Sequence, residues 1–359
     1  MNSPPPEDKP SFVEDFFPGY FALVMATGIV SLAMHFEGIP GLPELLLWLN
    51  VVFYVVLWGI TVLRILWFRS ALIADLTHHA RGVTFLTAVA GTGVLGVQFA
   101  ILTPFIVVAA GLWVFAVLLW IILIYTFFAA VTVAEPKPSL EVAINGSWLL
   151  VTVATESLAV LGTLVAQTLG PVRPILFGAL CAYLLGAMFY ILFIGLIFYR
   201  WIFLRMEPAK LTPTYWINMG ALAITTLAGA RLMLSSKSWE ILHDFQPFIG
   251  GFTLFFWATG TWWIPLLVIV GFWRHVVERV PVTYDPQYWS LVFPLGMYTV
   301  ATSMFANATR MPFLLIIPRI AVYIAMLAWL ITFSAMLLKL GKFCIAYGRR
   351  KIALATRAQ

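Results

Sequence analysis

Long apolar segments alternate with short polar connections along almost the whole chain. Each segment holds about 20 residues or more, the length that an α-helix needs to cross a hydrocarbon layer of roughly 30 Å. Because the connections are short, consecutive segments are expected to form helical hairpins. The expected spans are 17–36, 42–68, 83–102, 104–131, 146–166, 174–203, 214–234, 247–275, 287–307 and 315–345. The pattern predicts an all-α integral membrane protein with ten transmembrane helices arranged as five hairpins.

Composition supports this class. Of the 359 residues, 62% are hydrophobic and 10% are charged, whereas soluble domains carry about 25% charged residues. We expect a transmembrane domain over 16–346. A disordered, proline-rich cytoplasmic tail at 1–15 is expected before it, and a basic cytoplasmic tail at 347–359 after it.

Residues that carry chemistry in enzymes and metalloproteins are sparse. Cys181 and Cys344 both lie in apolar segments, which predicts neither a disulfide framework nor a metal site. The histidines have no metal-ligand spacing, and polar residues do not cluster at one membrane depth. We therefore expect no cofactor and no enzymatic activity. Although the formal net charge is +6, we expect no nucleic-acid partner. The basic residues lie at the ends of the predicted helices, as is typical of membrane proteins.

The basic residues are unevenly divided between the two sides of the predicted bundle. With the N-terminus inside, 16 of the 21 Lys and Arg residues fall in cytoplasmic segments and 5 on the opposite side. This division follows the positive-inside rule. We expect both termini in the cytoplasm and the protein in a plasma membrane, of the bacterial inner-membrane type.

The odd and even segments differ in side-chain size. Gly, Ala, Ser and Thr are far more frequent in the odd segments, whereas eleven of the fifteen Trp residues lie in or at the ends of the even ones. Small residues let helices approach closely or line a lumen, and large aromatic residues suit lipid and interfacial positions. The alternation favours a quasi-five-fold arrangement, with an inner ring of odd helices that lines a pore. The alternative is close packing in an irregular bundle.

A weak internal repeat supports the ring. Each odd segment begins with an aromatic residue, and two helical turns later, on the same face, its residue is small. The aromatic residues are Tyr20, Phe85, Trp148, Trp216 and Trp289, and the small ones are Thr27, Thr92, Thr155, Ala223 and Gly296. The next positions in register are Gly28, Gly93, Glu156, Ile224 and Met297. We expect the odd-helix residues of this register to line the pore.

One position of the repeat is occupied by a much larger side chain than its equivalents. Four residues after each aromatic residue stand Val24, Val89, Thr152, Gly220 and Phe293. Pro294 follows, and proline kinks a membrane helix where neighbours satisfy the freed carbonyl. If these positions face a common lumen, Phe293 is the residue able to occlude it, with Pro294 beside it. The alternative is a core phenylalanine next to a packing kink.

Three stretches resemble the family of tellurite-resistance and dicarboxylate transporters, which includes the TehA-like proteins and the plant slow-type anion channels. The first helix reads FPGYFALVMATGIVSLA. The entry to the third segment reads HHARGVTFLTAVAGTG, similar to the family's His-Pro-x-Arg-x-x-Phe pattern with Ala80 in place of the proline. The ninth reads YWSLVFPLGMYTVAT, with the family's Phe-Pro pair. The resemblance covers about 17–345. It implies a homotrimer with one pore in each protomer, permeation of small anions, and a gate at Phe293.

Glu156 lies in the middle of the fifth segment. A carboxylate at the centre of a bilayer is costly unless it is paired, protonated or hydrated, so it is a functional candidate by default. One reading is a protonated Glu156 that couples proton and anion movement. The other is a structural pair with Arg231 of the seventh segment.

Four basic residues stand at the ends of odd segments, where they could concentrate anions at a pore mouth. Arg231 lies near the end of the seventh segment, Arg310 follows the ninth, and His79 and Arg81 precede the third. Ordinary interfacial placement is the alternative for each of them. The sequence thus predicts an anion-selective channel or facilitator with a phenylalanine gate. The alternative function is a proton-coupled carrier or exporter of dicarboxylate, sulfite or tellurite-type oxyanions.

Overall fold

A computed structural model describes residues 12–168 and 172–357, with side chains to Lys342. In these ranges the chain is helical and has no strand, and ten helical spans are long and apolar enough to cross a membrane. The spans are Pro18–Phe36, Leu42–Trp67, Gly82–Leu102, Ile106–Val133, Gly146–Thr168, Val172–Phe203, Pro213–Leu234, Gln246–Val277, Pro286–Thr309 and Pro312–Lys342. The ten predicted helices are confirmed, with ends displaced by a few residues. Most of the predicted tail 1–15, and the side chains of the predicted tail 347–359, lie outside the described residues.

The helices form an inner and an outer set. The inner helices are α1 (Ala22–Phe36), α4 (Leu86–Leu102), α7 (Leu150–Thr168), α9 (Ile217–Leu234) and α12 (Trp289–Thr309). The outer helices are α2 (Leu42–Trp67), α5 (Ile106–Val133), α8 (Val172–Phe203), α11 (Gln246–Phe272) and α13 (Ile316–Arg357). In the most apolar 18 residues of each span, between 83% and 94% are buried in the inner helices, against 17% to 39% in the outer ones. The small residues of the odd segments therefore mark helices that are surrounded by protein.

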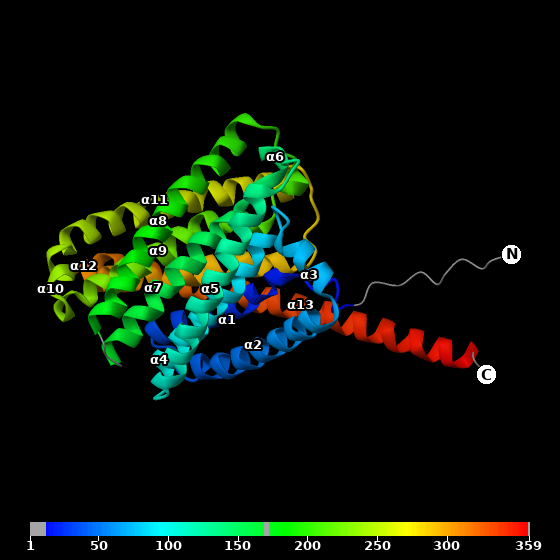
Figure 1. Ribbon diagram of the computed structural model, residues 1–359, viewed down its shortest axis with the longest axis horizontal. Coiled ribbons are helices and arrows are strands. Elements are labelled where there is room, and N and C mark those ends of the chain that lie inside the picture. Colours follow the sequence, from blue (N-terminus) through cyan, green and yellow to red (C-terminus); the bar gives the residue numbers. More distant parts are fainter. Residues whose placement is uncertain (1–11, 169–171, 358–359) are drawn as a thin grey trace.

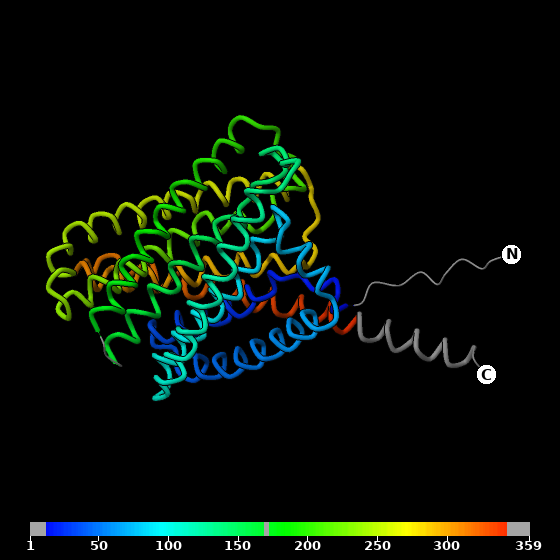
Figure 2. Tube along the Cα trace, in the orientation of Figure 1, coloured from blue at the N-terminus to red at the C-terminus, as the bar shows by residue number. Residues whose placement is uncertain are grey.

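The inner helices close into a ring. In order, α1, α4, α7, α9 and α12 each contact the next, and α12 contacts α1. Figures 1 and 2 show α1, in blue, beside the orange α12 and the first part of α13. This is the quasi-five-fold arrangement that the alternation of small and large residues predicts.

Every inner helix begins with a 3-10 turn at the same end of the bundle. The turns are Pro18–Phe21, Gly82–Phe85, Gly146–Leu149, Pro213–Trp216 and Pro286–Tyr288. We call this end the N-terminal face and the other the C-terminal face. The short helices α3 (Arg69–Leu76) and α6 (Leu140–Ala143) lie at the N-terminal face, and α10 (Glu240–Asp244) lies at the C-terminal face (Figure 1). The direction of the inner helices thus sets the polarity of the ring.

Hydrogen bonds from outer aromatic side chains to inner threonines hold the two sets together. Trp329 donates to Thr27 at 3.0 Å, Trp120 donates to Thr155 at 2.9 Å, and the Tyr54 and Thr92 hydroxyls lie 2.9 Å apart. The outward surfaces of the outer helices carry exposed side chains such as Leu118, Ile191 and Leu327. These faces are apolar, as contact with lipid requires.

Candidate functional site

A vestibule of about 590 Å³ opens at the N-terminal face, where the inner helices begin. Each inner helix contributes to its wall through its first turn or the residues before it. These residues include Phe17, Thr84, Ser147, Thr214 and Gln287. The backbone N–H groups at a helix N-terminus carry a partial positive charge. The vestibule therefore lies where five such partial charges converge.

Charged side chains in the vestibule wall add to this potential. Arg81, Arg200 and Lys210 line it together with two acidic residues, Glu141 and Asp285. Asp285 accepts a hydrogen bond from the backbone N–H of Gln287 at 2.8 Å, as a helix N-cap does. The side chains alone leave one net positive charge. Together with the helix N-termini, the wall favours anions over cations.

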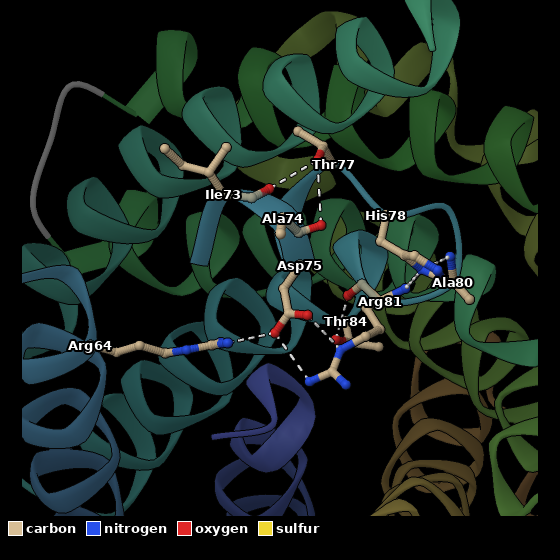
Figure 3. A network of polar contacts seen from close by, with 9 residues as sticks. All are labelled: Arg64, Ile73, Ala74, Asp75, Thr77, His78, Ala80, Arg81 and Thr84. Carbon is tan, nitrogen blue, oxygen red and sulfur yellow. Dashed lines mark hydrogen bonds and ion pairs between the residues drawn. The ribbon is translucent and has the colours of Figure 1, made fainter. Parts of the chain in front are cut away.

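Asp75 of α3 fixes the position of Arg81. Its carboxylate lies 2.8 Å from Nε of Arg81 and 2.6 Å from Nη2 of the buried Arg64 in α2. The backbone N–H groups of Ala80 and Arg81 donate to the His78 ring at 3.1 and 3.3 Å. Figure 3 shows Asp75 between Arg64 and Arg81. One carboxylate serves two guanidinium groups, so the network keeps one positive charge at the edge of the vestibule.

Arg200 of α8 lies deeper and has different partners. It is 4% exposed. Nη1 donates to the backbone oxygen of Ile144 at 2.6 Å and to the hydroxyl of Tyr215. Nε is buried without a hydrogen-bond partner among the described residues. Arg200 was not among the predicted site residues, although a cation inside an apolar segment, one turn before its end, is a recognisable signal.

Between the vestibule and the next cavity lies the segment of α12 that holds Phe293. The Phe293 side chain is 1% exposed. Pro294 packs against α9, since a Cβ built on Gly220 would lie 2.6 Å from its ring. Phe293 precedes Met297 by one helical turn and Val300 by two, so the three share a face. Both Met297 and Val300 line the cavity on the other side.

That cavity lies inside the ring toward the C-terminal face. Its volume is about 30 Å³, which leaves room for little more than one water molecule. All five inner helices contribute to the wall, which includes Ile29, Gly93, Ser157, Ile224 and Met297. At the C-terminal end stands Arg231, whose Nη2 donates to Gln167 at 3.2 Å and whose Nε lies 3.4 Å from Thr163 Oγ1. The cavity is narrow and apolar, with a cation at its end.

The predicted pore-lining residues divide between this cavity and the contacts around it. Gly93 and Met297 line the cavity. The hydroxyls of Thr27, Thr92 and Thr155 face outer helices through the bonds described above. Gly28 packs against Val94 and Gln98, and Gly296 packs against Ile29. The remaining ones are buried, and these are Val24, Val89, Thr152, Gly220 and Ala223.

Glu156 points away from the ring axis. Its side chain contacts Gly186 of α8, where an added Cβ would lie 2.8 Å from Glu156 Cγ. Both carboxylate oxygens are buried and lack a hydrogen-bond partner among the described residues. The structural pair with Arg231 is not formed, since Arg231 bonds to Thr163 and Gln167 instead. A buried, unpaired carboxyl group is stable in its neutral form.

His79 and Arg310 lie outside both hollows. Burial, followed by the nearby His78 and Lys137, lowers the pKa of His79 below its ordinary value. The lowered pKa leaves His79 neutral near pH 7. Arg310 is exposed at the end of α12 in the left-handed conformation, with φ at 57°. Of the four basic candidates, Arg81 and Arg231 are therefore the two that line a hollow of the ring.

Comparisons with known proteins agree on a class. The sequence profile described as voltage-dependent anion channel matches residues 15–337. An uncharacterized membrane protein of Mycobacterium tuberculosis is 39% identical over 161 residues, 45% of this chain and 81% of that protein. An uncharacterized transporter of Methanocaldococcus jannaschii is 25% identical, covering 82% of this chain and 86% of its own. A sulfite efflux pump of Arthroderma benhamiae is 24% identical over 90% of both chains.

Proposed function

This chain belongs to the voltage-dependent anion channel family, and from that membership we propose that its five inner helices line a pathway for small anions, with Phe293 as the gate. The family consists of channels and transporters, which supports transport, rather than catalysis, as the activity that we propose. The pathway would run from the vestibule, past Phe293, into the narrow cavity and out beside Arg231.

One observation carries the proposal. Two hollows on the axis of a closed helical ring are separated by the stretch of α12 that contains a buried phenylalanine. The vestibule carries converging helix N-termini and basic side chains, and the cavity ends at a second cation. Selectivity for anions would come from helix-end dipoles, pore width and these basic residues.

The direct test is an anion-substitution series with the purified protein in liposomes or planar bilayers. We expect flux of chloride, nitrate and sulfite, with no flux of potassium, and saturation or unitary currents would separate a carrier from a channel. Protein-free liposomes made in the same way are the control. Cation flux equal to anion flux, or no flux above this control for any anion, would contradict the proposal.

A second candidate is a proton-coupled exporter of an oxyanion. Glu156 favours it, because a carboxyl group without a partner inside the bundle is a candidate proton-binding residue. The relatives named as sulfite efflux pumps also favour it. Sulfite, dicarboxylates and tellurite are the substrates to compare in that case, with and without a pH gradient.

Three further features belong to the proposal. The resemblance supports a homotrimer in which each protomer has its own pathway, and the apolar outer helices would supply both lipid and subunit contacts. The distribution of Lys and Arg supports a cytoplasmic N-terminal face, with both termini inside. A plasma membrane of the bacterial inner-membrane type is the setting that we propose.

A further inference from the structure

The guanidinium group of Arg200 is a buried cation without an anionic partner. It is 4% exposed, and no carboxylate among the described residues lies within 4.0 Å of it. Its two hydrogen bonds go to neutral oxygens, of the Ile144 backbone and the Tyr215 hydroxyl. Burying a charge is costly unless an opposite charge compensates it. No described residue pairs with Arg200, so an anion from outside the chain could supply the compensating charge.

Arg64, a second buried arginine at the same face, differs from Arg200 because it has a counterion. Arg64 is 2% exposed, and its guanidinium lies 2.6 Å from the Asp75 carboxylate. Both arginines stand near the N-terminal face in outer helices. Arg64 has a resident counterion, whereas Arg200 faces a hollow of about 590 Å³ that can admit one.

The free edge of Arg200 indicates the shape of that anion. Both hydrogen bonds use Nη1, and Nε is buried without a hydrogen-bond partner among the described residues. The N–H groups of Nε and Nη2 point in the same direction and match two oxygens of one planar or pyramidal oxyanion. A halide can accept from this edge but cannot satisfy both positions with separate atoms.

Polar groups on neighbouring elements complete a possible site. Asn145, Ser147, Thr212 and Thr214 line the same vestibule, on the turns that precede α7 and α9. The Thr212 and Thr214 hydroxyls lie 2.7 Å apart. Hydroxyl, amide and backbone N–H groups at a helix N-terminus are ordinary anion ligands.

We propose that Arg200, between the beginnings of α7 and α9, forms a binding site for a small oxyanion of the sulfite, nitrate or carboxylate type. The inference deepens the proposed function, on which it rests for the physiological role of the site. The site would hold an oxyanion in the vestibule before it reaches Phe293. It gives the protein a preference among anions that net charge alone does not supply.

Binding to the purified, full-length protein tests the site without transport. Calorimetric and thermal-stability titrations would compare sulfite, nitrate and chloride at constant ionic strength. For the wild type we expect saturable binding of both oxyanions, tighter than that of chloride. Arg200→Gln should abolish it. Arg200→Lys, which keeps the charge but not the forked edge, should weaken oxyanion binding about tenfold and remove the preference over chloride.

Arg205→Gln is the matched control, since Arg205 is an exposed basic residue just beyond α8 that does not line the vestibule. It should bind like the wild type. If Arg200→Gln does not fold, the Arg200→Lys result decides. Unchanged oxyanion preference in Arg200→Lys, or no saturable binding by the wild type, would overturn the inference. Flux without such binding would leave the proposed function standing, whereas binding without flux would leave only the site.

Discussion

At the scale of single residues, Phe293 offers the sharpest separation between a gate and a core side chain. A buried core Phe→Ala change costs about 3–5 kcal/mol of stability and leaves a sealed cavity. We expect Phe293→Ala instead to join the two hollows and to conduct anions constitutively, at near wild-type stability. Phe293→Leu should be intermediate. The measurement is chloride or nitrate current, paired with a thermal unfolding assay.

Phe305 gives the matched control on the same helix. It is also 1% exposed, but its ring stacks on Trp257 of α11, with centroids 6.1 Å apart. Phe305→Ala should lower stability and add no conductance. A Phe293→Ala protein that behaves like Phe305→Ala, unstable and silent, would mean that Phe293 is a packing residue.

Glu156 separates the two transport mechanisms. Glu156→Gln keeps the shape of the side chain and replaces the carboxyl group, which can bind and release a proton, by an amide that cannot. Because Glu156 has no cationic partner to leave unpaired, we expect the variant to fold like the wild type. If the protein is a proton-coupled carrier, anion uptake should persist and lose its dependence on a pH gradient. Liposome flux at several pH gradients measures this, with the exposed Glu240→Gln as control. A folded Glu156→Gln variant with unchanged pH dependence would contradict proton coupling through Glu156.

At the scale of elements, the first turns of two inner helices approach so closely that position 146 requires a glycine. A Cβ added to Gly146 would overlap the backbone oxygen of Thr214 at the start of the next inner helix. We expect Gly146→Ala to destabilise the protein by about 2 kcal/mol, since backbone must move. Gly178→Ala in α8 meets nothing within 4 Å and should stabilise by about 0.5–1 kcal/mol. Thermal melts of the two variants check this, and equal effects would contradict the predicted contact.

The sequence could predict the helices but not the rotation of each about its axis. Apolar length and small-residue content identified the spans and the two sets. Gly93, Ile224 and Met297 of the repeat register line the narrow cavity, whereas α1 and α7 contribute Ile29 and Ser157 rather than Gly28 and Glu156. One residue corresponds to about 100° of rotation. A shift of one position therefore turned Glu156 from the ring axis toward α8.

Arg200 shows a second limit of the sequence. Its place at the end of an outer segment resembles that of many interfacial cations. Only the fold brings it beneath the turns before α7 and α9 and leaves it without a carboxylate.

At the scale of the whole molecule, the predicted orientation in the membrane can be tested independently of transport. In the predicted topology, 16 of the 21 Lys and Arg residues fall on the cytoplasmic side, which is the side of the N-terminal face. We expect a reporter that is active only in the cytoplasm to be active when fused to Gln359. A fusion after Lys237, at the C-terminal face, should be silent. The opposite result in a correctly inserted protein would reverse the orientation and the direction of the pathway.

The bond between Trp329 and Thr27 joins residues 302 positions apart, and this separation has a consequence for biosynthesis. The helices leave the ribosome in order, so α1 lies in the membrane without its packing partners until α12 and α13 have been inserted. Until then, a groove rich in small and hydroxyl-bearing residues faces lipid, which cannot satisfy it. A chain that stops before α13 would therefore leave this polar surface uncovered and open to quality-control proteases. We expect such a truncation to reduce the amount of protein in the cell more than a point mutation in any outer helix does.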